Sequence, residues 1–263
     1  MRPHLKAVAL PSGKTKEKIL EIERLHKVFH MNGGFQTVLE EITFRAEGGE
    51  LICILGRSGC GKSTLLKIVA GFIWPSSGKV LLKGKPVKAP GPDRCVIFQE
   101  DALFPWLTVE ENIAFGLRGR GQSKKSKADE VERFLGLVGL REFRGYLPRA
   151  LSGGMKQRVA LARVLILKPE VLLMDEPFAS LDAQSREEMQ NLLLSLWKEL
   201  AHTILFVTHD VNEAVILADK ILFMSKNPGA IREKIRIDLP RPRSRDGSTF
   251  LGFCRKFHEA LRD

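Results

Sequence analysis

The chain has 263 residues, which is enough for one large α/β core with a subdomain but not for two independent domains. Its net charge of +11, from 42 basic and 31 acidic residues, fits anionic lipid and nucleic acid equally well and decides between neither. No apolar run approaches the roughly 18–20 residues of a membrane span, and the four cysteines lack the paired spacing of a metal site.

The N-terminus is basic but lacks the apolar segment of a secretory signal, so we expect no such signal. Cysteines in or beside an apolar run fit a reducing cytosol. Basic residues are dense at Lys14–Lys18, Arg118–Lys127 and Arg232–Arg245. Runs of this kind are usually solvated faces or tails. Along the rest of the chain, apolar strands alternate with helical stretches, which predicts an α/β fold with a mostly parallel sheet.

The first strong motif is a phosphate-binding loop. Leu51–Leu55 is an apolar run typical of a strand buried on both faces, and it leads into GRSGCGKST, Gly56–Thr64. Glycines in such a loop let N–H groups surround a phosphate at a helix start, while Lys62 pairs with the outer phosphates and the Ser63 hydroxyl binds Mg²⁺. We expect the Cys60 thiol to be sensitive to alkylation. The predicted nucleotide-binding residues here are Gly56, Ser58, Gly59, Cys60, Gly61, Lys62, Ser63 and Thr64.

Gln99 follows a predicted strand, Arg94–Phe98. Its amide could contact Mg²⁺ or the attacking water, or it could begin a loop. The chain then turns helical, with a capping box at Thr108-x-x-Glu111 and helical spacing over Ala128–Val138.

The segment ALFPWL, residues 102–107, places three large apolar side chains beside Gln99. Core packing is one interpretation. We favour a partly exposed groove for a partner's helix, because Phe and Trp rarely gather in a loop without use.

A second motif, LSGGMKQ at Leu151–Gln157, opens a predicted helix with Ser152 as its N-cap. Gly153 and Gly154 follow directly and weaken the helix by roughly 1 kcal/mol each relative to alanine. Alone, this pattern is an ordinary glycine-rich loop before a helix. The cost makes sense if an anion must approach the positive end of the helix closely.

Two further strands deliver polar residues to the sheet edge where α/β ligands bind. Val171–Met174 is followed by Asp175, a candidate Mg²⁺ ligand, and by Glu176, a candidate general base. Thr203–Thr208 is followed by His209, which could donate to a γ-phosphate. The sequence Asp210-x-x-Glu213 could cap the next helix.

These residues, in this order, resemble the ATP-binding subunits of ABC transporters. Gly56–Thr64 is similar to the Walker A motif, Val171–Glu176 to Walker B, and Leu151–Gln157 to the signature, with Met155 in place of its usual glutamine. The remaining correspondences are Gln99 with the Q-loop, Ser180–Asp182 with the D-loop, His209 with the switch histidine, and Phe29 with an aromatic that stacks on adenine.

The resemblance covers about residues 19–240, with a basic extension before it (1–18) and a basic C-terminal tail after it (241–263). It implies a P-loop NTPase core with a mostly parallel sheet, an N-terminal antiparallel β subdomain and an inserted helical subdomain at about residues 100–155. It also implies catalysis by Glu176 and His209 with Lys62 and Gln99, and a Mg²⁺ site of Ser63, Gln99 and Asp175.

In this family two copies form a head-to-tail homodimer. The resemblance therefore implies that Ser152 and Gly154 of one copy complete the ATP site that holds Lys62, Asp175 and Glu176 of the other. Gly153 and Asp182 are further candidate nucleotide-binding residues. It further implies two separate membrane permease subunits, an indirect solute-binding protein and a peripheral location on the cytoplasmic face of the cell membrane.

Phe98–Leu117 and the tail IDLPRPRSRD, Ile237–Asp246, are similar to importers of nitrate, sulfonate and taurine. The solute itself stays open. The alternative is a soluble ABC-type ATPase that acts on DNA or in assembly, but such proteins usually carry a long coiled coil, and none lies between Lys62 and Asp175, so nucleic acid is disfavoured. A small-molecule kinase would leave the Ser-Gly-Gly segment without a role, and a translation factor would need two such modules.

Overall fold

The computed structural model describes residues 17–31, 33–99, 103–119, 121 and 123–261. Its strands form an antiparallel sheet of order β2-β1-β4-β5 and a second sheet of order β10-β9-β3-β8-β7-β6. In the second sheet β9, β3, β8, β7 and β6 run parallel and β10 is antiparallel to β9. The expected mostly parallel sheet and N-terminal antiparallel sheet are therefore both present.

The strands are β1 (Lys18–Met31), β2 (Gly34–Glu47), β3 (Leu51–Gly56), β4 (Ser77–Leu82), β5 (Lys85–Pro86), β6 (Arg94–Ile97), β7 (Val171–Asp175), β8 (Thr203–Thr208), β9 (Lys220–Met224) and β10 (Ile231–Arg236). The helices are α1 (Lys62–Ala70), α2 (Val109–Phe115), α3 (Lys124–Leu137), α4 (Gly153–Leu165), α5 (Ala183–Leu200), α6 (Val211–Leu217) and α7 (Ser248–Ala260), with short 3₁₀ turns η1 (Arg141–Phe143) and η2 (Pro148–Ala150). None of the helices in the described part of the chain combines the length and the apolar character needed to span a bilayer.

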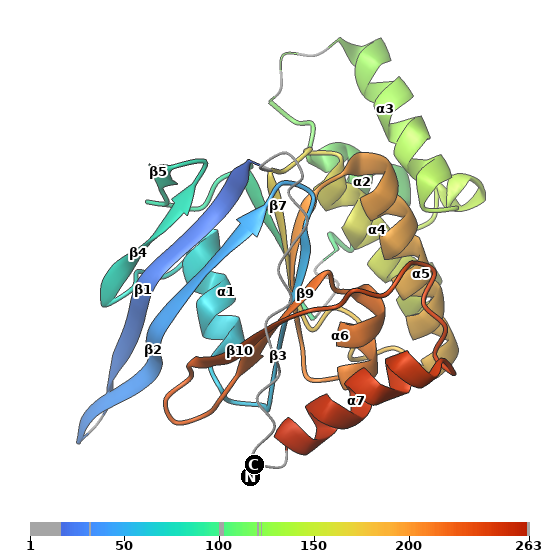
Figure 1. The fold of residues 1–263 in the computed structure, drawn as a ribbon. Helices are drawn as coiled ribbons and strands as arrows, with labels where there is room; N and C mark the ends of the chain where they lie inside the picture. Colours follow the sequence, from blue (N-terminus) through green and yellow to red (C-terminus); the bar gives the residue numbers. More distant parts are fainter. Residues whose placement is uncertain (1–16, 32, 100–102, 120, 122, 262–263) are drawn as a thin grey trace.

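The parallel sheet is covered on both faces (Figure 1). Helix α1 lies between it and the antiparallel sheet, and helices α4 to α7 lie on its other side. On β3, Ile52 and Ile54 belong to the core around α1, whereas Leu51, Cys53 and Leu55 belong to the core beneath α4 to α7. Successive side chains of a strand point to opposite faces, so a strand covered on both sides is apolar throughout.

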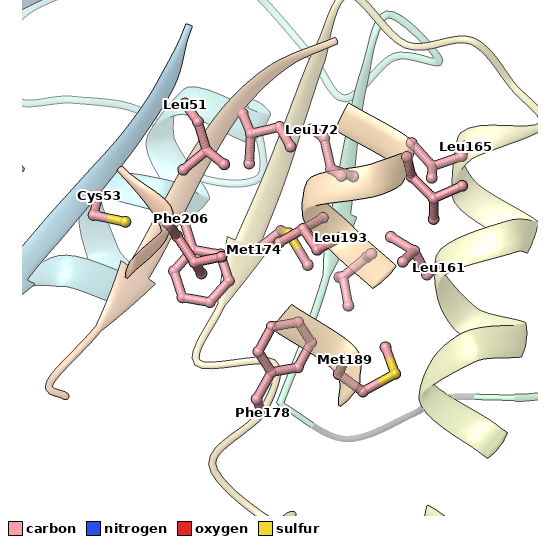
Figure 2. Close-up of a cluster of buried hydrophobic side chains, with 14 of the residues drawn as sticks. Leu51, Cys53, Leu161, Leu165, Leu172, Met174, Phe178, Met189, Leu193 and Phe206 are labelled. Carbon is pink, nitrogen blue, oxygen red and sulfur yellow. The ribbon is translucent and has the colours of Figure 1, made fainter. Parts of the chain in front are cut away.

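Figure 2 shows part of the core beneath the helices, where α5 supplies Met189 and Leu193. The rings of Phe178 and Phe206 lie 5.6 Å apart between centroids, and both side chains are buried. Phe178 comes two residues after Glu176. Because truncating a buried phenylalanine to alanine costs about 3–5 kcal/mol, this ring fixes the chain firmly just beyond the end of β7.

The helical segment follows β6 in the chain, and its helix α3 extends away from the parallel sheet (Figure 1). The predicted capping box is present, with Thr108 Oγ1 accepting from Glu111 N and Glu111 Oε2 accepting from Thr108 N. The expected start of this subdomain at residue 100, the apolar Ala102 and most of the N-terminal extension lie outside the described residues.

The residues after 240, expected as a basic tail, contain α7, which packs beside α6 (Figure 1). Phe250, Cys254 and Phe257 of α7 are buried in the core. Two of the preceding arginines also point inward. Arg241 and Arg243 are partly buried and donate to backbone carbonyls, so the charge of this stretch is not that of a solvated face.

Candidate active site

The register of the parallel sheet brings the predicted site residues to one edge. Leu55 of β3 is paired with Thr208 of β8, and Val207 is paired with Asp175 of β7. Glu176 N also donates to Val207 O at 3.0 Å. The residues that follow each strand therefore meet at the carboxyl edge, where ligands of parallel sheets bind.

The loop from Gly56 to Gly61 takes a shape that only glycine suits at key positions. Gly59 and Gly61 have φ angles of 78° and 98°, in the left-handed region. A Cβ on Gly61 would lie 2.7 Å from Leu39 Cδ2, and one on Gly56 would lie 2.8 Å from Cys60 Sγ. These contacts come from the chain itself, so the fold alone already requires these glycines.

The loop lysine and the two candidate catalytic groups form a connected set. Lys62 Nζ donates to Gly56 O at 2.8 Å and lies 3.4 Å from Glu176 Oε1, and its side chain is 4% exposed. The other carboxylate oxygen, Glu176 Oε2, is 2.7 Å from His209 Nδ1. Glu176 is thus aligned between a buried cation and an imidazole.

The backbone of Glu176 is strained. Its φ of 46° lies in the left-handed region, which costs a non-glycine residue about 1–2 kcal/mol. Strain of this kind is found where the surroundings fix a side chain for function. Nothing in the sequence around Glu176 indicated this conformation.

Ser63 and Asp175 place a hydroxyl and a carboxylate side by side, with Ser63 Oγ donating to Asp175 Oδ1 at 2.9 Å. Burial raises the pKa of the Asp175 carboxyl above its ordinary value, and the Ser63 hydrogen bond opposes that shift. A half-buried carboxylate next to a hydroxyl supplies the oxygen ligands that Mg²⁺ prefers. The residues therefore fit this ion.

Gln99 lies just beyond β6, and Ile97 of β6 is paired with Met174 of β7, so Gln99 is on the same edge as Asp175. The side chain of Gln99 is exposed, and its backbone carbonyl accepts a hydrogen bond from Gln157 Nε2 at 3.5 Å. Phe29 lies on β1, in the other sheet, and the Lys27 ammonium is 4.7 Å from its ring centroid. One face of the Phe29 ring therefore carries a cation.

The predicted helix start at Ser152 is present and exposed. Ser152 Oγ accepts from Met155 N at 3.3 Å as the N-cap of α4. A Cβ on Gly153 would lie 3.6 Å from Leu181 Cδ2, and one on Gly154 would lie 3.8 Å from Ser185 Cβ, which are ordinary contacts. The glycines at this helix start are therefore not required by the chain's own packing. Asp182 caps α5 and is also exposed.

Residues supporting His209 were not identified as such from the sequence. Asp210 caps α6 as expected, accepting from Glu213 N at 3.1 Å. Glu213, however, does not complete a capping box but accepts from Thr208 Oγ1 at 2.6 Å. One signal in the sequence indicated such a supporting role: Glu213 is an acidic residue in the first turn of a short helix that follows a strand.

Cys60, which we expected to be sensitive to alkylation, is buried within the phosphate-binding loop. Its side chain is 2% exposed, and burial raises the pKa of its thiol. The thiolate is the reactive form, so the burial and the raised pKa both oppose the expected sensitivity to alkylation. Beside the loop, a cavity of about 630 Å³ is lined by Arg57, Ser58, His209, Lys226 and Leu261.

Residues 39–179 match the family model described as ABC transporter. An uncharacterised ABC transporter ATP-binding protein of Methanocaldococcus jannaschii is 47% identical, with 93% of this chain and 91% of that protein covered. The nitrate import ATP-binding protein NrtD of Synechocystis is 47% identical over 84% of this chain and 83% of its own length. The bicarbonate transport ATP-binding protein CmpD of Synechococcus elongatus is 45% identical over 90% and 86%.

Solved structures agree with these relatives. CbiO1 of Clostridium perfringens, part of an ABC transporter complex, has a TM-score of 0.76 and 29% identity over 84% of this chain and 90% of its own. A dimeric ATP-binding cassette in a post-hydrolysis state with ADP and phosphate has a TM-score of 0.72 and 28% identity over 84% of this chain and 100% of its own.

Proposed function

The chain belongs to the ABC transporter family, and on that premise we propose that it is the ATP-hydrolysing subunit of an importer for a small anion. The alignment of Lys62, Glu176 and His209 at the sheet edge carries the proposal. Two relatives, a nitrate import protein and a bicarbonate transport protein, favour transport over an action on DNA.

ATP is bound, in this proposal, by the loop Gly56–Thr64. Backbone N–H groups of the loop and the start of α1 surround the phosphates, and Lys62 moves from its carbonyl partners to the outer phosphate oxygens. Phe29 supports the adenine by stacking.

Hydrolysis requires a base next to the last phosphate. Glu176 accepts the proton of the attacking water, and His209, whose Nδ1 lies 2.7 Å from the carboxylate, donates its ring N–H to the γ-phosphate when ATP is bound. Ser63, Asp175 and Gln99 would hold Mg²⁺, which supplies positive charge to the phosphate oxygens. Removal of the ion should abolish hydrolysis while the fold persists.

A second copy completes the site. Ser152, Gly153 and Gly154 are exposed or open to approach, and their glycines have no packing reason in this chain. The positive end of α4 fits the γ-phosphate held by another protomer. Asp182, at the start of α5, belongs to the same face and contributes to the nucleotide site of the partner copy.

The partners outside the dimer are two membrane permease subunits and, indirectly, a solute-binding protein. This places the subunit at the cytoplasmic face of the cell membrane as a peripheral protein. Trp106 is 71% exposed and its ring lies 5.7 Å from that of Phe104, which follows Gln99 by five residues in the sequence. We assign this aromatic pair to the groove that receives a permease helix.

The decisive experiment uses Glu176→Gln. The variant should bind ATP with Mg²⁺ as wild type does but release phosphate at least about 100-fold more slowly, because the base is lost. With ATP it should elute as a dimer in size-exclusion chromatography, whereas with ADP it should elute as a monomer.

Two controls make the outcome interpretable. Wild-type turnover per protomer should rise with protein concentration, since each site needs two copies. Lys62→Ala should lose ATP affinity itself. Hydrolysis by Glu176→Gln at the wild-type rate would contradict the assignment of Glu176 as the base. An ATP-loaded Glu176→Gln variant that stays monomeric would contradict the shared site.

A further inference from the structure

Glu213 is a buried carboxylate that the reaction described above does not use. It is 5% exposed and lies in the first turn of α6, four residues after His209. One oxygen, Oε2, accepts from Thr208 Oγ1 at 2.6 Å, and that hydroxyl in turn accepts from Asp210 N at 3.0 Å. The residues on both sides of His209 are therefore tied to the same carboxylate.

The second oxygen of Glu213 continues the connection into the core. Gln190 Nε2 of α5 donates to Glu213 Oε1 at 3.2 Å, and Gln190 is 2% exposed. Arg245 Nη2 donates to Gln190 Oε1 at 2.7 Å. A continuous hydrogen-bonded chain thus runs from Arg245, in the segment before α7, through Gln190 and Glu213 to the loop that carries His209.

Both carboxylate oxygens of Glu213 have a hydrogen-bond donor. The two donors, Thr208 and Gln190, are neutral. Asp210 and Arg186 are charged groups that act on it with opposite sign, and Arg186 Nη1 lies 4.0 Å from Asp210 Oδ2. Burial raises the pKa of Glu213, and the hydrogen bonds from Thr208 and Gln190 oppose this shift.

The other end of α6 is held by the same segment of chain. Arg243 Nη1 donates to Val215 O at 2.6 Å and to Ala218 O at 2.7 Å, so the guanidinium caps the last turn of α6. Burial lowers the pKa of Arg243 to about 10. Arg241 bonds Asp219 Oδ1 at 2.6 Å. Helix α6 is therefore fixed at its start through Glu213 and at its end by arginines.

We propose that Glu213 is a positioning residue for His209, and that Arg245 supports Glu213 through Gln190. The proposal rests on the catalytic role assigned to His209 above. Only two residues, His209 and Asp210, lie between β8 and α6. The carboxylate that binds Thr208 therefore sets where the imidazole stands relative to Glu176. Through Arg245 the basic segment after residue 240 becomes part of the catalytic support.

The test is a double-mutant cycle between Glu213 and His209, read as kcat and KM for ATP. Glu213→Ala should lower kcat about 10-fold to 100-fold with little change in KM, because a displacement of about 1 Å at a catalytic group costs this much. Glu213→Gln keeps an acceptor for Thr208 and should retain most of the activity. In a His209→Ala background, Glu213→Ala should change kcat by less than about twofold, since its effect passes through the imidazole.

Arg245→Ala leaves the buried carboxylate in place and serves if Glu213→Ala does not fold. It should give a smaller loss of kcat that is also absent in the His209→Ala background. Lys256→Ala is the matched control. It removes the 3.4 Å ion pair between Lys256 of α7 and Glu233 but none of the hydrogen bonds that link Arg245 to Glu213, so kcat should be unchanged.

The outcomes distinguish a failure of the positioning role from a failure of the proposed function. If His209→Ala hydrolyses ATP at the wild-type rate, the role of His209 fails and the proposed function must be revised. If His209→Ala is impaired but the effects of Glu213→Ala or Arg245→Ala multiply with it, the positioning role is overturned while the proposed function stands.

Discussion

The two glycine motifs of this chain differ in what requires them. In the phosphate loop, Gly61 has a φ of 98° and a Cβ there would lie 2.7 Å from Leu39 Cδ2. At the start of α4, a Cβ on Gly154 would meet its nearest side chain at 3.8 Å. The loop glycines are demanded by the protomer's own packing, whereas Gly153 and Gly154 are not.

This difference indicates where the rest of the site comes from. The loop side is nearly complete within one chain, because Lys62 pairs with Glu176 and Ser63 with Asp175. The helix start has an exposed N-cap and two glycines that weaken the helix without relieving any clash. A glycine kept at such a position points to something that approaches from outside the chain.

The largest effect should come from Gly154→Ala. A methyl group here holds the phosphate of a neighbouring protomer away from the helix start, so turnover should fall about 100-fold, as when one donor to a developing charge is removed. The midpoint of thermal unfolding should stay the same or rise, because alanine favours the helix by about 1 kcal/mol. Phosphate release and thermal melting measure the two effects.

Gly145→Ala is the matched control, since a Cβ there meets no atom within 4 Å. It should alter neither quantity. Should Gly154→Ala instead destabilise the isolated protein while retaining full turnover, the contrast between the two motifs would be reversed.

Gly61→Ala should act on the opposite property. The strained φ and the close contact with Leu39 should lower the free energy of unfolding by about 1–3 kcal/mol, even without nucleotide. Denaturant unfolding of the nucleotide-free protein measures this. Gly252→Ala in α7, where a Cβ meets nothing within 4 Å, is the control and should be neutral or stabilising. Equal stability of Gly61→Ala and wild type would show that the loop tolerates a side chain.

Asp175→Asn should reveal the cost of preparing the loop side for an ion. The folded-state pKa of Asp175 is raised, so its ionisation favours the unfolded chain. Below the ordinary value of 3.8, Asp175 is protonated in both the folded and the unfolded chain, so the variant gains nothing. The gain begins as the pH rises above 3.8 and is complete above the folded pKa. Without nucleotide, the variant should therefore melt a few degrees higher than wild type at neutral pH but not at acidic pH. A constant difference across the range would refute this origin.

The smallest effect is an expected lack of reaction. With its raised pKa and 2% exposure, Cys60 should stay unmodified by iodoacetamide at pH 7.5 in the folded protein and react on unfolding. Peptide mass mapping distinguishes Cys60 from Cys95, which is only partly buried. Rapid modification of native Cys60 would mean that the loop opens far more than its packing implies.

The sequence predicted the parts of the fold that follow local patterns. Leu51–Leu55, Val171–Met174 and Thr203–Thr208 were expected as strands, and each is a strand to within one residue. Motif spacing also indicated Lys62 and Glu176, because chemistry at a strand end depends on residues that are adjacent or nearly so in the chain. These features need no knowledge of distant contacts.

Other features depend on residues that are far apart in the sequence. Arg245 and Gln190 are separated by 55 positions, and no periodicity or composition links them. The inward orientation of Arg243 depends on free carbonyls at the end of α6, which a count of charges cannot reveal. The φ of Glu176 is likewise set by its surroundings and not by its neighbours in sequence.

The burial of β3 on both faces has a consequence for how accurately the loop is placed. Ile52 and Ile54 fill one core while Leu51, Cys53 and Leu55 fill the other. Slippage of this strand by a single residue would exchange the two sets, leaving each core with side chains shaped for the opposite one. Both cores therefore resist the same error, and Gly56 is delivered to the sheet edge with its alignment enforced twice.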